Sequence, residues 1–228
     1  RSKGRASQQL DKAYALLVRG DMEGVRGASF IYRRSKTKKE VRARALGGQA
    51  LAHVLLNLEF GLKESSKGKA QLLDEARSML KLPKTTHTAL GKAAKIGLLL
   101  AQGKIKQGLT LADDSVGKHS QSPWLYYMNG RILFCQGSWE AAANNLMHAL
   151  KLAKAPKYWI HLSLIRLWLT HYRPKKLKAH LDFLHKTAPQ NPAVQLAVIH
   201  HDHIKCRQEL SCPCRGLQNK LSLLGANN

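Results

Sequence analysis

Apolar residues recur every three or four positions along most of the chain, which is the spacing of one buried face of an α-helix. These stretches are separated by glycines suited to turns, at Gly20, Gly61, Gly103 and Gly137. Leu, Ala, Lys and Gln recur throughout, while β-branched residues are sparse, as is typical of helices. The pattern predicts an all-α chain of short helices that alternate with turns.

The segment 122–156 contains the most complete copy of an internal repeat. Its characteristic positions are Tyr126, Asn129, Gly130 and Leu133 on a first helix, then Gly137, Trp139, Glu140, Ala142, Leu146 and Ala149 in a turn and second helix. Gly103 and Gly137 lie 34 residues apart, which is the tetratricopeptide period. The segment resembles the tetratricopeptide repeat (TPR) family, in particular in Gly-Ser-Trp-Glu-Ala-Ala. Asn129 and the displaced Pro156 depart from the family pattern.

The resemblance covers roughly 5–191 and implies a right-handed superhelical stack of about five antiparallel helix hairpins, a TPR-like α-solenoid. We expect hairpins at about 5–36, 37–84, 86–120, 122–156 and 157–191, a capping helix at 193–205 and an irregular, Cys-containing tail at 206–228. Residues 1–205 would then form one repeat domain. Small residues at Gly130, Ala142 and Ala149 let the two helices of a hairpin approach closely.

Large side chains mark the same helix face in two consecutive repeats. The predicted partner-binding residues are Trp124, Tyr127, Arg131, Phe134, Tyr158, His161 and Trp168. In the TPR family this face of the first helix lines a concave groove, so an extended or helical peptide would dock there, with Arg131 available to a carboxylate. The alternative is that several of these rings pack between hairpins, because core residues have the same spacing.

The formal net charge of +24, from 38 Lys and Arg against 14 Asp and Glu, indicates an acidic partner. The densest basic run is Arg33, Arg34, Lys36, Lys38, Lys39, Arg42 and Arg44. Phosphate binding is one interpretation of this run and a solvated surface is the other. No recognisable nucleic-acid module accompanies it, so we expect a protein or peptide ligand and keep nucleic acid as the alternative.

Histidines and cysteines cluster near the C-terminus. They could hold a metal ion, form one disulfide or belong to an inert tail. No Cys-x-x-Cys pair occurs, so we predict no metal site and keep only weak candidate ligands, His200, His203, Cys206, Cys212 and Cys214.

The sequence has no Ser/His/Asp order, phosphate-cradling glycine loop or His-Glu-x-x-His motif. We therefore predict a non-enzymatic scaffold or adaptor without a cofactor. A structural TPR subunit of an envelope or secretion assembly is a further alternative. No run reaches about 18 uninterrupted apolar residues, so no membrane span is predicted. We expect a cytoplasmic protein, or a periplasmic or secreted one if a signal peptide preceded Arg1.

Overall fold

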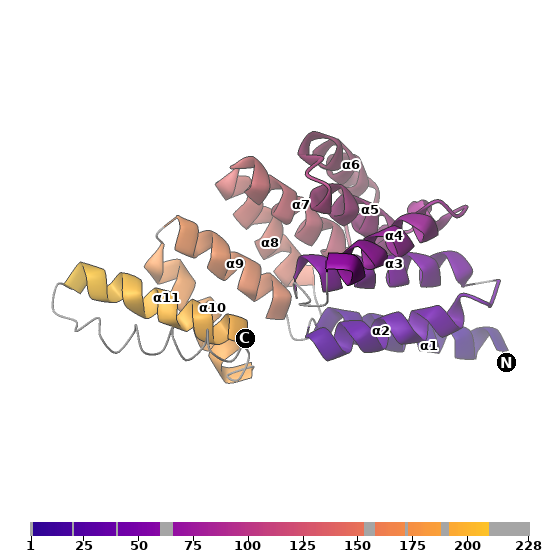
Figure 1. Cartoon of the computed structure of the whole chain (residues 1–228), viewed down its shortest axis with the longest axis horizontal. Coiled ribbons are helices and arrows are strands. Elements are labelled where there is room, and N and C mark those ends of the chain that lie inside the picture. Colours follow the sequence, from indigo (N-terminus) through magenta and orange to yellow (C-terminus); the bar gives the residue numbers. More distant parts are fainter. Residues whose placement is uncertain are drawn as a thin grey trace. The chain divides into compact units, whose positions relative to one another are not determined.

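The computed structural model describes residues 2–19, 21–39, 41–59, 66–152, 158–171, 173–187 and 192–209, which form α-helices joined by turns (Figure 1). Two compact units result, Arg1–Trp159 and Ile160–Asn228. The predicted fold class, an all-α stack of helix hairpins, is confirmed. The two units differ from the single domain expected over 1–205, whose boundaries stay a prediction. Among the described residues, no helix has the length and apolar character needed to span a bilayer.

Unit 1 consists of four hairpins and the start of a fifth. The helices are α1 (Ser2–Arg19), α2 (Met22–Ser35), α3 (Arg42–Leu58), α4 (Ser66–Leu80), α5 (Ala89–Ala101), α6 (Ile105–Lys118), α7 (Pro123–Gln136) and α8 (Trp139–Leu152), with a short 3₁₀ helix, η1 (Thr85–His87). Helices that follow one another along the chain lie side by side, and α3 also packs on α5 and α5 on α7. This is the neighbour-to-neighbour packing of a repeat protein.

The ends of these helices follow ordinary capping chemistry. Asp21 accepts a hydrogen bond from the Gly24 amide at 2.7 Å and begins α2, and Thr88 begins α5 in the same way. Pro123 stands at the start of α7, where its missing N–H costs nothing. Gly137 ends α7 with φ of 88°, a left-handed conformation that glycine adopts without steric penalty.

The core of unit 1 lies between the helices of each hairpin and between neighbouring hairpins. Ala142, Leu146 and Ala149 of α8 are fully buried. A Cβ added at Gly130 would lie 2.8 Å from Leu146 Cγ, which is too close for two carbons. The predicted close approach of α7 and α8 at Gly130 is therefore present.

Unit 2 contains most of α9 (Tyr158–Thr170), then α10 (Pro174–Thr187) and α11 (Pro192–Glu209). Buried apolar side chains recur at intervals of three or four residues within each helix, among them Ile160, Leu164, Leu167, Leu177, Leu181, Leu184, Val194 and Ala197. The last helix corresponds to the expected capping helix, but it continues to Glu209 instead of ending at 205. Cys206 therefore lies within α11.

Candidate functional site

The predicted aromatic face of α7 is occupied by the chain itself. Trp124 and Tyr127 have no exposed surface, contrary to the expectation that their rings line an open groove. Trp159 stacks on Trp124 with ring centroids 4.3 Å apart and meets Tyr127 edge-on at 4.2 Å. Tyr158 is buried as well. These rings form part of the core of unit 1.

Arg131 is engaged by a carboxylate of this chain. Its guanidinium forms an ion pair with Glu59, which follows directly after α3 and whose side chain is only 4% exposed. The Tyr127 hydroxyl donates to Glu59 and accepts from Arg131 Nη1 at 2.9 Å. Glu59 thus supplies the acidic group that the sequence led us to expect from a partner.

Contacts between distant hairpins explain this burial. The indole N–H of Trp159 donates to the carbonyl oxygen of Val18, at the end of α1, over 3.1 Å. Glu59 and Arg131 in turn connect the end of α3 to α7. Side chains of hairpins that are not neighbours in sequence therefore meet over the face that was expected to stay open.

Phe134, one turn after Arg131, is only half-buried. Its ring meets that of Trp139 edge-on, with centroids 5.3 Å apart. Trp139 begins α8 and is 36% exposed, so it is among the exposed large apolar side chains of the described residues. An accessible aromatic pair thus remains at the turn between α7 and α8.

The corresponding residues of unit 2, His161 and Trp168 of α9, each contact side chains of α10. His161 stacks on Phe183 with ring centroids 4.0 Å apart, and its Nδ1 lies 2.9 Å from Nδ1 of His180. Burial lowers the pKa of His180 below its ordinary value, so a neutral imidazole is favoured. Trp168 is half-buried, and the Lys176 ammonium lies 4.8 Å from the centre of its ring.

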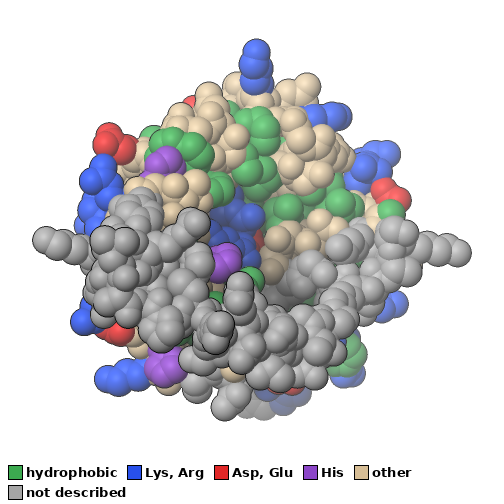
Figure 2. Space-filling model, turned by 60° about the vertical axis from the view of Figure 1, so that its left-hand side comes forward, with side chains coloured by type: hydrophobic (Ala, Val, Ile, Leu, Met, Phe, Trp, Pro, Cys, Tyr) green, Lys and Arg blue, Asp and Glu red, His purple; other side chains and the backbone are tan. Residues whose placement is uncertain are grey.

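The predicted basic run extends from the end of α2, through the following turn, to the first turn of α3. Its described members other than Lys36 are exposed. The run comprises Arg33, Arg34, Lys36, Lys38, Lys39, Arg42 and Arg44. Arg44 lies 3.8 Å from Asp11, a distance typical of a weak surface pair. Lys and Arg side chains also occur at many places on the face that Figure 2 shows.

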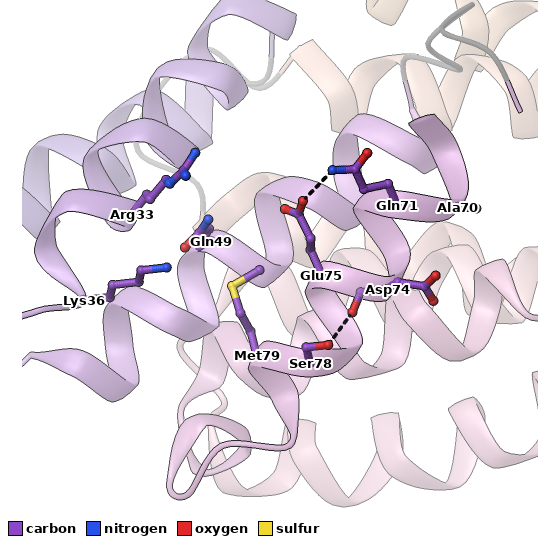
Figure 3. Close-up of a pocket in the computed structure, with 9 residues that line it drawn as sticks. All are labelled: Arg33, Lys36, Gln49, Ala70, Gln71, Asp74, Glu75, Ser78 and Met79. Carbon is purple, nitrogen blue, oxygen red and sulfur yellow. Dashed lines mark hydrogen bonds between the residues drawn. The ribbon is translucent and has the colours of Figure 1, made fainter. Parts of the chain in front are cut away.

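A cleft of about 760 Å³ opens beside this basic run, between α2 and α4 (Figure 3). Arg33 of α2 and Lys36, directly after that helix, lie on one side, and residues of α4 lie on the other. Gln49 of α3 lies between them. The lining residues are Arg33, Lys36, Gln49, Ala70, Gln71, Asp74, Glu75, Ser78 and Met79.

A buried histidine connects the three helices next to the cleft. His53 of α3 has Nε2 at 3.1 Å from Ser29 Oγ of α2 and Nδ1 at 3.4 Å from Glu75 Oε2 of α4. Burial lowers the pKa of His53, and the attraction of Glu75 opposes this effect. The ring is therefore a neutral link between the helices at pH 7 and above.

The weak metal-ligand candidates are mostly outside the described part of the chain. His200 is exposed on α11, whereas the side chains of His203 and Cys206, and the whole of Cys212 and Cys214, are not among the described residues. Within the part of the chain that the structure describes, no three His, Cys, Asp or Glu side chains gather as around a metal ion. The prediction of no metal site stays a prediction.

The structure resembles a thermophilic TPR protein of Thermus thermophilus. The TM-score is 0.55, the sequence identity is 17%, and the match covers 84% of this chain and 95% of that chain. The fold is TPR-like. No family model and no curated protein sequence matches the chain. The comparison therefore supports the helical-repeat architecture and leaves function to be argued from this chain's own residues.

Gln49 and His53 of this TPR-like fold were missed by the sequence analysis. Both lie in the apolar stretch of α3, and each is only 5% exposed. Single polar residues in such a stretch are usually satisfied in the core. Their signal was their four-residue spacing, which places both on one face of the helix, and their closeness in sequence to the densest basic run.

Proposed function

We propose that this protein is a non-enzymatic scaffold whose stacked helix hairpins bind an acidic partner protein. The observation that carries the proposal is the imbalance of charge on the hairpins. Most described carboxylates are already engaged within the chain, by Arg19, Arg44, His53, Arg77, Lys92, Lys118, Arg131 and His201. With 38 Lys and Arg against 14 Asp and Glu, most cations have no counter-charge of their own.

Such a surface favours association with anionic macromolecules, because the summed field attracts them and displaced counterions add to the affinity. Stacked repeats also present long surfaces that suit an extended partner. The accessible aromatic groups near the predicted face are Phe134 with Trp139 in unit 1 and the half-buried Trp168 in unit 2. We propose these as apolar contacts, in place of the buried Trp124 and Tyr127.

A nucleic-acid partner is the second candidate, and one exposed ring favours it. Phe30 of α2 is 59% exposed, directly before the basic run, and the Arg34 guanidinium lies 5.5 Å from the centre of its ring. An exposed aromatic ring among cations is suited to stacking a nucleic-acid base.

Affinity capture from a native lysate, with and without nuclease treatment and at two salt concentrations, tests the proposal. We expect an acidic protein to be retained after nuclease treatment and to be released by salt. Retention that disappears with nuclease, and that Phe30→Ala also abolishes, would refute the protein scaffold and establish the nucleic-acid alternative. Phe134→Ala serves as the test of the aromatic contact.

A further inference from the structure

The cleft between α2 and α4 continues into a second cavity. This neighbour has a volume of about 590 Å³ and is lined by Lys36, Thr37, Arg42, Leu46, Ser78, Met79 and Leu82. Lys36, Ser78 and Met79 line both cavities. The two form one groove along α4. Gln71 and Met79 are eight residues apart on α4, so this part of the groove is about 12 Å long.

Gln49 lies in the floor of the groove with an unused acceptor. Its side chain is 5% exposed, and its Oε1 accepts no hydrogen bond from any described residue. A buried acceptor without a donor costs about 1 to 3 kcal/mol. The oxygen itself has almost no accessible surface, so a ligand N–H in the groove, most commonly a main-chain amide, would remove that cost only after the Gln49 amide turns towards the groove.

The charges of the groove favour an anionic ligand. Arg33, Lys36 and Arg42 form no ion pair with a described carboxylate, although all three line the groove. The two acidic residues on the α4 wall are already engaged. Asp74 pairs with Arg77, and Glu75 accepts a hydrogen bond from Gln71 at 3.1 Å.

We propose that this groove binds an extended acidic segment of a partner protein. The carboxylates of the segment pair with Arg33, Lys36 and Arg42, and the Gln49 amide turns towards the groove so that its Oε1 accepts one main-chain N–H. About four residues of an extended strand span about 12 Å, so the segment is short. The proposal rests on the proposed function and adds to it the place of binding and the chemistry of the ligand.

The same groove is poorly suited to nucleic acid. None of its lining residues is aromatic, so it offers no stacking surface for bases.

Fluorescence anisotropy with labelled hexaglutamate tests the proposal on the full chain. The site variant is Arg33→Gln/Lys36→Gln. Lys104→Gln/Lys106→Gln, at exposed positions around the start of α6, is the control with the same net charge. We expect the site variant to bind about ten-fold more weakly. The control should change affinity by less than about two-fold, because only the diffuse field is altered.

Gln49→Leu tests the hydrogen bond at constant charge. We expect about a five-fold loss of hexaglutamate affinity, the range of one neutral hydrogen bond. Thermal unfolding distinguishes binding from a structural role, since removing an unpaired buried acceptor should leave stability unchanged or raise it. An unchanged affinity, or a loss that accompanies destabilisation, would overturn the role of Gln49 and with it the proposal.

The remaining outcomes separate this inference from the proposed function. Equal losses of affinity in the site variant and the control would show that hexaglutamate is attracted by the overall positive charge of the surface. That result would refute the groove as the binding site but not the proposal of an acidic partner. Labelled hexauridylate bound by the protein, with no hexaglutamate binding, would overturn both. Hexaglutamine, which is uncharged, should not bind at all.

Discussion

The buried pair of Glu59 and Arg131 allows a quantitative prediction. Arg131→Met keeps an apolar stem of similar length but removes the cation from a carboxylate that is 4% exposed. Removing one partner of a buried pair typically costs about 3 to 5 kcal/mol, because the remaining charge is left without compensation. Tyr127 still donates to Glu59 in this variant, so we expect a loss near the lower end, about 3 kcal/mol.

Urea denaturation followed by circular dichroism at 222 nm measures this loss. The near-ultraviolet signal, to which the stacked Trp124 and Trp159 contribute, reports in addition on the packing of the aromatic rings. For a unit of this size, about 3 kcal/mol corresponds to a decrease of Tm of roughly 10 °C. Lys106→Met removes the same charge from an exposed position and should change stability by less than about 0.5 kcal/mol.

A double variant tests whether the unpaired Glu59 charge causes this loss. In Glu59→Gln/Arg131→Met, the neutral amide can still hydrogen-bond with the Tyr127 hydroxyl, so most of the lost stability should return. A cost of Arg131→Met below about 1 kcal/mol, similar to that of an exposed salt bridge, would refute the burial of this pair. Arg131 would then be available to a carboxylate of a partner.

Three further predictions follow from the packing. Gly130→Ala should cost about 2 kcal/mol in urea denaturation, since its Cβ would meet Leu146 Cγ at 2.8 Å, and a neutral effect would show that α7 and α8 can separate freely. Trp159→Phe should cost about 1 to 3 kcal/mol, because the buried Val18 carbonyl loses its donor, and hydrogen exchange at the end of α1 should increase with it. Because the pKa of His53 is lower in the folded than in the unfolded state, its neutral ring stabilises the fold above the unfolded pKa of about 6.5, and this stability falls as the pH drops towards the folded pKa. His53→Gln should therefore flatten the dependence of the unfolding free energy on pH between pH 7.5 and 5.5. An unchanged slope would assign the pH dependence to other groups.

Local features of this fold could be predicted from the sequence. Helix periodicity and turn glycines act over a few residues, and the structure has Gly103 and Gly137 at positive φ as the turns require. The close packing of α7 on α8 follows from small residues within one hairpin, where Gly130 and Ala142 are near in sequence. These predictions depend on contacts that the repeat itself defines.

The accessibility of the aromatic face could not be predicted in this way. A side chain that lines a groove and one that lies in the core have the same spacing along a helix, so the outcome depends on what else reaches the face. Tyr127 is covered through Glu59, 68 residues away, and Trp159 is held by Val18, 141 residues away. No pattern within a repeat encodes such pairs. Gln49 was missed for a related reason, since its exposure to a groove depends on the separation of α2 and α4.

The hydrogen bond between Trp159 and the Val18 carbonyl also affects the folding of unit 1. Repeat arrays with only neighbour contacts can fray from an end, and their stability is close to a sum over repeats. A contact between Trp159, at the end of unit 1, and the first hairpin raises the contact order of the unit, because a long loop must close before this hydrogen bond can form. Unit 1 should therefore fold in one cooperative step and more slowly than an open array of the same length, and removing α1 and α2 should unfold all of it.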